Sequence, residues 1–173
     1  EYTKTIPKPM VKIKGVPILI RIIKIYLKFG FKEFIIASGY KSKIVKEYFK
    51  KKFEKLKVKV VFTGKDTMTG GRIKRLKKYL KNERFLLTYG DGLCDLNLRK
   101  LIKFHIKNKN FATLTAVRPP ARFGGIKISG NKVRYFKEKS SLDEGWINGG
   151  FFVFEPEIFK FLKNDSTVLE QGP

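Results

Sequence analysis

The 173-residue sequence predicts an α/β fold with a mixed, mostly parallel sheet, and two features of its pattern support this prediction. Segments whose apolar residues recur at helical spacing alternate with short runs that are apolar throughout. Such runs are typical of strands that helices cover on both faces, as in a largely parallel sheet. A Gly-Asn pair between two alternating segments adds an antiparallel hairpin element. We therefore expect residues 1–173 to form a single domain in which helices flank the sheet.

Pro17 is expected to open the first helix at its first turn, and Gly30 to end it. Proline suits a first helical turn, because the N–H that it lacks would have no partner there. Glycine directly after the last apolar residue is a common helix stop. The apolar residues between them recur at helical spacing and are Ile18, Ile22, Ile25 and Phe29.

The later elements follow from the same two patterns. Asn97 is expected to cap the helix that follows it, and Gly130-Asn131 to form the hairpin turn. Strands are expected at 34–38, 57–62, 85–89, 112–117 and 149–154, with the hairpin at 126–136. Helices are expected at 44–53, 72–80 and 98–110, and a final helix at 157–162 that Pro156 opens.

The composition is strongly basic, with 39 Lys and Arg against 15 Asp and Glu and a formal net charge of +24. Such a charge suits an anionic partner, but lysines that simply solvate helix faces give the same count. The lysines recur along the whole chain, and the aromatic residues fall at core spacing and form no stacking platform for bases. Without a nucleic-acid-binding motif, we expect no nucleic acid partner.

Cysteine use and hydropathy bear on the compartment. The single cysteine, Cys94, excludes an internal disulfide and fits a reducing environment. No apolar run reaches the roughly 18 residues that would span a bilayer. The first ten residues carry no apolar segment typical of a signal peptide. We therefore expect a cytoplasmic protein with no membrane partner.

The first candidate for chemistry is Asp91, which follows the predicted strand 85–89 and lies between two glycines. Ligands of α/β sheets bind beyond the carboxyl ends of the strands, where this aspartate is expected. A carboxylate there can hold Mg²⁺, a hard cation that bridges substrate phosphates. An Asp-Gly pair chosen only for its turn conformation explains the local pattern equally well.

Two further candidates are polar segments with positive charge. The loop 63–72, TGKDTMTGGR, runs into a predicted helix and can offer backbone N–H groups to an anion, with Arg72 as an added donor. A glycine-rich turn with a surface arginine is the alternative. Lys8 lies between two prolines, which stiffen the backbone around its ammonium group. That cation suits a phosphate, or is simply solvated.

His105 and Cys94 are interpreted as structural residues. His105 is the only histidine and lies on a predicted apolar helix face, so Ser-His-Asp chemistry would depend on it alone. No group of His and Cys has the spacing of a zinc site.

Taken together, these motifs are far more specific than any one of them. They are KPMV at 8–11, GY at 39–40, DTMTGGR at 66–72, TYGDG at 88–92, RFG at 122–124, FKEK at 136–139 and WINGGFFVF at 146–154. In their order and spacing these motifs resemble the sugar-1-phosphate nucleotidylyltransferases, over nearly the whole chain, and the cytidylyl branch in particular. The resemblance implies a Rossmann-like nucleotide-diphospho-sugar transferase fold.

The resemblance also assigns roles residue by residue. Lys8, Arg72 and Asp91 take the catalytic positions, with Lys8 on a substrate phosphate and Asp91 as the Mg²⁺ ligand. Thr67 and Arg72 match nucleotide- and substrate-binding positions of the DTMTGGR loop. The positions implied for the rest of the substrate-binding site are Gly90, Gly124, Glu138, Lys139, Asn148 and Gly149.

The reaction that the resemblance implies uses CTP and glucose 1-phosphate and forms CDP-glucose and pyrophosphate, with Mg²⁺ as cofactor. Glu138 would accept hydrogen bonds from sugar hydroxyls, and Lys139 would pair with the sugar phosphate. Alternatives are a related enzyme that uses UTP or dTTP, and a non-catalytic protein that binds a sugar nucleotide. We also expect a homo-oligomer, and a place in nucleotide-sugar biosynthesis such as that of the lipopolysaccharide O-antigen.

The sequence departs from the family pattern in four places. The family's opening strand and glycine-rich loop, and a second metal-binding aspartate further along, have no counterpart between Glu1 and Pro173. The connection from Lys52 to Thr63 is shorter than in cytidylyltransferases, and Ser140 replaces a proline. We therefore expect a domain that lacks the triphosphate-binding loop and the C-terminal part, and whose activity by itself is open.

Overall fold

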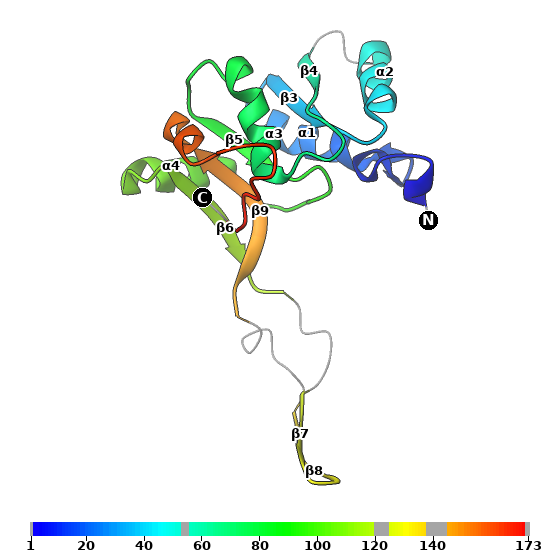
Figure 1. The fold of residues 1–173 in the computed structure, drawn as a ribbon, viewed down its shortest axis with the longest axis vertical. Coiled ribbons are helices and arrows are strands. Elements are labelled where there is room, and N and C mark those ends of the chain that lie inside the picture. Colours follow the sequence, from blue (N-terminus) through cyan, green and yellow to red (C-terminus); the bar gives the residue numbers. More distant parts are fainter. Residues whose placement is uncertain (1, 53–55, 120–124, 138–144, 172–173) are drawn as a thin grey trace.

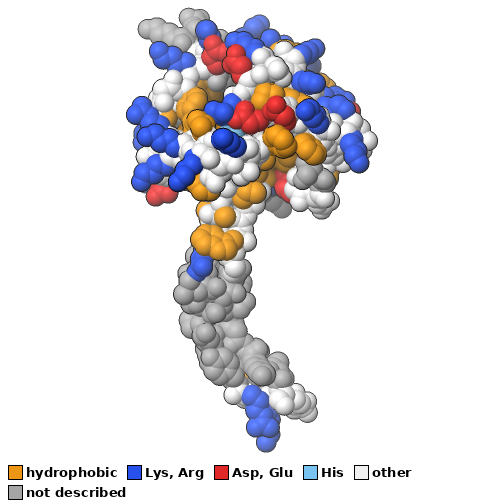
Figure 2. All heavy atoms as spheres, turned by 90° about the vertical axis from the view of Figure 1, so that its left-hand side faces the viewer, with side chains coloured by type: hydrophobic (Ala, Val, Ile, Leu, Met, Phe, Trp, Pro, Cys, Tyr) orange, Lys and Arg blue, Asp and Glu red, His pale blue; other side chains and the backbone are white. Residues whose placement is uncertain are grey.

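Strands and helices alternate along the chain in the order that the sequence predicts (Figure 1). The computed structural model describes residues 2–52, 56–119, 125–137 and 145–171. None of the described helices is long and apolar enough to cross a membrane. Lys and Arg side chains are scattered over the surface shown in Figure 2 and do not gather in one patch, which fits lysines that solvate the protein surface.

Two features near the amino end were not predicted. Two short 3-10 helices, η1 (Tyr2–Lys4) and η2 (Lys8–Met10), precede a small antiparallel pair, β1 (Lys12–Ile13) and β2 (Val16–Pro17). The turn between these strands places Lys14 and Gly15 at positive φ, a conformation that glycine adopts without strain. Strands of two residues leave no hydropathy pattern, so sequence alone gave no sign of them.

Helix α1 (Ile18–Lys28) lies between two apolar clusters. Ile22 and the partly buried predicted residues Ile18, Ile25 and Phe29 pack in one cluster with Leu98, Phe151 and Val153. Leu19, Ile20 and Ile23 pack in the other cluster, with Val45 and Phe49 of α2 (Ser42–Lys52). The helix is therefore apolar on two sides, as expected of a helix at the centre of a domain.

The described strands form two main sheets. β3 (Glu33–Ser38) pairs in parallel with β4 (Lys57–Phe62). In the other sheet, β9 (Ile147–Phe154) lies between β5 (Phe85–Thr88) and β6 (Ala112–Val117) and is antiparallel to both. β5 and β6 consequently run in the same direction.

Contacts at both ends show that β3 and β5 also run in the same direction. At their amino ends, Lys81 Nζ, just before β5, lies 3.5 Å from Glu33 Oε2. At their carboxyl ends, Ser38 and Gly90 line a common cavity. All strands of the two sheets except β9 are thus parallel in direction, which confirms the predicted mixed, mostly parallel arrangement. No described strand pairs with the facing edges of β3 and β5.

The helices cover these sheets largely as expected. They are α2 (Ser42–Lys52), α3 (Thr69–Leu76), which continues as η3 (Lys77–Tyr79), and α4 (Leu98–Asn108). Asn97 caps α4 as predicted, with its side-chain oxygen 3.1 Å from the Lys100 amide nitrogen. The final predicted helix is instead a short 3-10 helix, η4 (Pro156–Lys160), and the segment after it accepts hydrogen bonds from Met68 and Gly71 through the carbonyls of Asp165 and Thr167.

The predicted hairpin is confirmed as β7 (Gly125–Ser129) and β8 (Lys132–Lys137). Figure 1 shows that it extends away from the body of the domain. The structural interpretation of His105 also fits its surroundings, since the side chain is only 1% exposed. Its ring nitrogens lie 2.8 Å from Thr113 Oγ1 and 3.1 Å from Glu155 Oε1.

Candidate active site

A cavity of about 470 Å³ lies at the carboxyl ends of β3 and β5. Most of its lining comes from Pro7 to Pro9 and from the end of β3, Ile36 to Tyr40, and the rest is Thr3, Leu19 of α1, Val45 of α2 and Gly90. This is the edge at which ligands of α/β sheets bind. The volume is within the range of pockets for small molecules, about 300–1,000 Å³.

Two of the predicted motifs meet at this cavity through Pro9 and Gly90. A Cβ atom added to Gly90 would lie 2.7 Å from Pro9 Cγ, closer than such atoms approach. Gly90 therefore lets the KPM segment pack directly on the end of β5. Lys8 is exposed, and its ammonium group forms no hydrogen bond or ion pair with another described residue. The cation is thus free to bind an anion at the cavity.

Asp91 is the next residue after this contact, and its side chain is exposed. Among the residues that the structure describes, no hydrogen bond or ion pair engages its carboxylate, and no group of three His, Cys, Asp or Glu side chains gathers. Mg²⁺ commonly binds to one or two carboxylates together with substrate phosphates and waters. A single free carboxylate beside a substrate-sized cavity fits that mode of binding, so the donor set is compatible with the expected metal.

Arg72 has a different position from the one expected of a free phosphate-binding group. Its Nη1 donates to Thr63 Oγ1 and to the Gly64 carbonyl, at 2.8 Å each, and its Nη2 donates to the Lys65 carbonyl at 3.1 Å. Burial, and next the neighbouring Arg75, lower the pKa of Arg72. The guanidinium therefore shapes the loop after β4, with its remaining N–H groups available to a ligand.

Gly39 links this arginine to the cavity. A Cβ atom at position 39 would lie 2.6 Å from the Gly64 carbonyl oxygen and 2.7 Å from Arg72 Nη1. The loops after β3 and β4 can approach each other only because residue 39 has no side chain. Gly39 also lines the cavity, so the Arg72 contacts determine the position of one of its walls.

The rest of the DTMTGGR segment packs against the C-terminal part of the chain. The Met68 amide donates to the Asp165 carbonyl (2.8 Å) and the Gly71 amide to the Thr167 carbonyl (3.2 Å). These two N–H groups are therefore not free for an anion. Thr67 is buried against Gly64, whose added Cβ would lie 2.2 Å from Thr67 Oγ1.

Asn148 and Gly149 lie at the start of β9, next to the end of β5. Asn148 Nδ2 donates to the hydroxyl of Tyr89 at 3.0 Å, and Tyr89 directly precedes Gly90. The structure thus brings Asn148 close to the segment that carries Gly90 and Asp91. Gly124, Glu138 and Lys139 lie outside the described residues.

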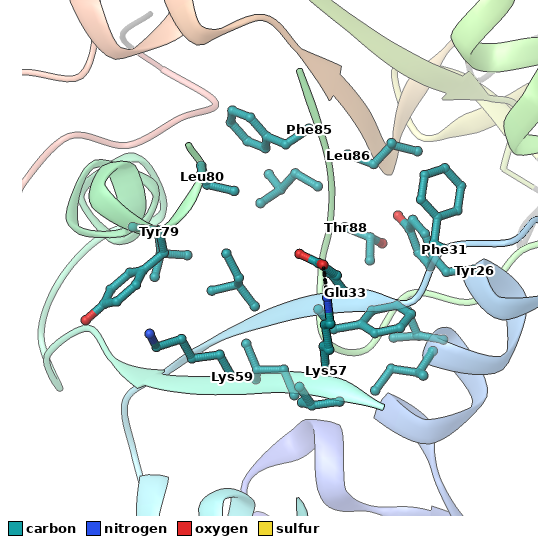
Figure 3. A pocket seen from close by; sticks show the side chains of 18 of the residues that line it. Tyr26, Phe31, Glu33, Lys57, Lys59, Tyr79, Leu80, Phe85, Leu86 and Thr88 are labelled. Atoms are coloured by element: carbon teal, nitrogen blue, oxygen red, sulfur yellow. Dashed lines mark hydrogen bonds and ion pairs between the residues drawn. The ribbon is translucent and has the colours of Figure 1, made fainter. Parts of the chain in front are cut away.

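A second, larger cavity of about 870 Å³ separates β3 from β5 and meets the first one at Gly90 (Figure 3). Its walls are the unpaired strand edges, α1 on one side and α3 with η3 on the other. They are largely apolar, as at Ile35, Leu86 and Leu87. At its entrance Glu33 forms an ion pair of 2.8 Å with Lys57. Charged side chains such as Lys59 and Lys78 also line this groove, but of the predicted site residues only Gly90 does, so the groove is not the candidate active site.

Comparison with known proteins gives the class. The model of the Nucleotidyl transferase family matches residues 2–172. The chain therefore belongs to the nucleotidyl transferase family, and the cavity at the ends of β3 and β5 is its candidate active site.

The similarity to particular relatives is closer still. The chain is 44% identical to the glucose-1-phosphate cytidylyltransferase of Salmonella typhi, over all of this chain and 76% of the relative. It is 40% identical to the probable glucose-1-phosphate cytidylyltransferase of Bacillus subtilis, again over all of this chain and 76% of the relative.

A solved structure shows the same fold. HddC from Yersinia pseudotuberculosis, in complex with GMP-PN, has a TM-score of 0.74 and 27% identity to this chain. The match covers 96% of this chain and 75% of the other. The predicted α/β transferase fold is thereby confirmed.

Proposed function

We propose that the protein transfers a cytidylyl group, forming CDP-glucose and pyrophosphate from CTP and glucose 1-phosphate. One observation carries this proposal: the KPM segment, the end of β5 with Asp91 and the loop held by Arg72 adjoin one substrate-sized cavity. They do so in a chain that is 44% identical to a glucose-1-phosphate cytidylyltransferase.

The chemistry requires positioning and charge neutralisation more than acid–base catalysis. An oxygen of the sugar phosphate attacks the α-phosphorus of CTP, and the bond to the β-phosphate breaks to release pyrophosphate. That oxygen is already deprotonated at neutral pH, since the second pKa of a phosphate monoester is about 6. No general base is required, in keeping with a histidine that is buried and whose ring nitrogens contact Thr113 and Glu155.

Positive charge offsets the repulsion between the two anionic substrates. Lys8 supplies an unpaired ammonium at the cavity, Arg72 keeps the adjoining loop in place, and Lys139 is proposed to pair with the sugar phosphate. Mg²⁺, which Asp91 would hold, neutralises phosphate charge when bound.

The test of this site is Asp91→Asn, which keeps the shape of the side chain and removes its charge. We expect loss of Mg²⁺-dependent pyrophosphate release from CTP, together with loss of Mn²⁺ binding measured by electron paramagnetic resonance. Asp95→Asn, an exposed carboxylate four residues further on, is the matched control. Normal turnover by Asp91→Asn would remove this residue from the mechanism.

Lys8→Ala tests the charge at the cavity. We expect the rate of pyrophosphate release to fall about 10- to 1000-fold, as for the deletion of one charge-stabilising group. Lys12→Ala, another exposed lysine a few residues on, is the control. A rate equal to that of the control would show that Lys8 contacts no phosphate.

The nucleotide is tested with a panel of CTP, UTP, dTTP and GTP, each with glucose 1-phosphate. A strong preference for UTP or dTTP would replace the cytidylyl assignment by the first alternative. Binding of CDP-glucose without turnover of any nucleotide would support the second, a non-catalytic binding protein.

We further propose that a strand and a glycine-rich loop, of the kind that the family resemblance implies, complete the domain in the groove between β3 and β5. Both facing edges are unpaired in the described part of the chain, and helices border the groove on both sides. An apolar strand parallel to both would join the two sheets. Its carboxyl end would lie beside Thr3 and the candidate active site.

Hydrogen exchange tests this strand. In a longer form of the protein with residues before Glu1, unpaired amides of β3 and β5 should exchange at least about 100-fold more slowly than in residues 1–173. Equal exchange rates in both forms would show that no further strand pairs with β3 and β5 in the groove.

The homo-oligomer and the cytoplasmic location are separate proposals. Light scattering on the same samples tests the first, and fractionation of cells tests the second.

A further inference from the structure

Tyr89 is at the centre of a chain of hydrogen bonds that none of the predicted roles uses. Its hydroxyl lies 2.5 Å from Glu170 Oε1 and 3.0 Å from Asn148 Nδ2. The other oxygen of Glu170 lies 2.7 Å from Thr69 Oγ1, at the start of α3. Residues from four segments, far apart in sequence, thus meet beside Gly90, the residue that lines both cavities.

The carboxylate of Glu170 gives this chain of hydrogen bonds a fixed direction. Hydrogen bonds from Tyr89 and Thr69 outweigh the effect of burial and lower the pKa of Glu170, so the ionised group only accepts. Burial, with the bond to Glu170, raises the pKa of Tyr89 to about 12, so the phenol keeps its proton at neutral pH. The proton of Tyr89 must therefore point to Glu170, and its oxygen must accept from Asn148.

The orientation of the Tyr89 hydroxyl determines whether the NH₂ group or the oxygen of the Asn148 amide faces Tyr89. An oxygen placed against Tyr89 would meet another acceptor, so the NH₂ group must lie there. The side-chain oxygen of Asn148 then accepts from the Gly150 amide at 2.8 Å. One N–H of the NH₂ group and one lone pair of the oxygen remain for a ligand.

The packing around Tyr89 keeps this geometry in place. The ring lies edge-to-face against Phe152, with 5.7 Å between the centroids. Gly150 has a φ of +76°, and an added Cβ there would lie 2.6 Å from Tyr89 Cδ2. The backbone of β9 therefore leaves just enough room for the ring, and the phenol has little freedom to turn away from Glu170.

We propose that Glu170 is a positioning residue, which acts through Tyr89 to orient the Asn148 amide toward a hydroxyl or phosphate oxygen of the sugar phosphate. The proposal rests on the proposed function for the identity of that ligand. Glu170 and Tyr89 need not touch the substrate themselves, because a carboxylate two hydrogen bonds away already decides how the amide is turned.

The test measures pyrophosphate release at saturating CTP while glucose 1-phosphate is varied. For Glu170→Ala and for Tyr89→Phe we expect KM for glucose 1-phosphate to rise about 10- to 100-fold, with a smaller change in kcat, as for misplaced binding groups. The KM of the double variant should be no higher than that of either single variant, since both substitutions break the same chain of hydrogen bonds. Additive losses, or an unchanged KM, would overturn the proposal.

Asp165→Asn is the control for loosening of the C-terminal segment. It weakens the ion pair that ties this segment to Arg75 of α3 but leaves the hydrogen bonds of Glu170 intact. We expect its KM to equal that of the wild-type protein. A rise equal to that of Glu170→Ala would show that Glu170 only anchors the segment, against the proposal.

If Glu170→Ala does not fold, Glu170→Gln replaces it as the test variant. The new side-chain amide can donate to the Tyr89 oxygen and so reverse the direction of the hydrogen bonds. A second measurement requires no turnover: NMR of the Asn148 side-chain amide should show slow hydrogen exchange in the wild-type protein and fast exchange in Glu170→Gln. Equal exchange in both would overturn the proposal. If wild-type turnover with every nucleotide is absent, the proposed function fails, whereas this measurement still decides the role of Glu170.

Discussion

The two cavities of this protein meet at Gly90 but differ in what lines them. The smaller one is bounded by the KPM segment with Lys8, the end of β3, Gly90 and apolar residues of α1 and α2, and Asp91 lies next to it. The larger one is bounded by apolar and charged side chains and by two strand edges without partners in the described part of the chain. Volume alone would favour the larger cavity as the active site. The position of the KPM segment, which lies only at the smaller cavity, selects that one.

The difference suggests how the domain separates stability from catalysis. Apolar side chains around the groove belong to the clusters that hold the sheets to the helices. At the smaller cavity, Lys8, Gly39 and Gly90 lie on turns and strand ends and belong to none of these clusters. A substitution in the groove should therefore change mainly the free energy of unfolding, and one at the smaller cavity mainly the rate.

The largest effect is expected for Leu87→Glu, which places a carboxylate among apolar residues of the groove. The free energy of unfolding should fall by about 3 kcal/mol, because the charge loses hydration without gaining a partner. Urea unfolding measures this change, with Leu93→Glu as the control at an exposed position. Equal effects of the two substitutions would mean that the groove is as well hydrated as the surface.

A smaller effect, this time on the rate, is expected for Gly90→Val. The new side chain would push Pro9 and the KPM segment away from the end of β5, since even a Cβ lies only 2.7 Å from Pro9 Cγ. We expect kcat/KM to fall about 100-fold, as for misplaced binding groups, with little change in unfolding. An added Cβ at Gly92 meets nothing within 4 Å, so Gly92→Ala is the control. A loss of stability without a loss of rate would contradict the proposed separation of stability from catalysis.

The smallest effect concerns neither cavity and depends on pH. Burial raises the pKa of Glu155, but bonds from Arg84 and His105 outweigh it, so the folded-state pKa lies below the usual value of about 4.5. Its carboxylate therefore stabilises the fold above about pH 4.5, and this contribution is lost as the pH falls through the folded-state pKa. Glu155→Gln should cost about 1 kcal/mol at pH 7 and less at pH 3.5.

Thermal unfolding at both pH values checks this prediction. Glu33→Gln is the control, because Glu33 forms exposed ion pairs with Lys57 and Lys81 that salt should screen. A cost of Glu155→Gln that is equal at both pH values would show that the charge of Glu155 does not contribute.

Local patterns were sufficient to predict most of the fold. The apolar stripe of α1, the Asn97 cap, the Gly-Asn hairpin and the strands β3, β4, β5, β6 and β9 all depend on residues close together in sequence. The resemblance of the ordered motifs to a family led correctly to the nucleotidyl transferases. The β1–β2 pair and the 3-10 form of η4 were missed, because elements so short are determined by their neighbours.

The sequence by itself thus determined the class of fold, the helices and strands, and a set of motifs that belong together. Only the tertiary structure decided which distant residues these motifs contact at the site. It packs Pro9 on Gly90, engages Arg72 with the carbonyls of its own loop, and places Glu170 against Tyr89. The physical reason is separation along the chain: Gly90 lies 81 residues after Pro9, and Glu170 lies 81 residues after Tyr89. Hydropathy periods report which face of an element is buried, but not which distant hydroxyl or carbonyl that face will meet.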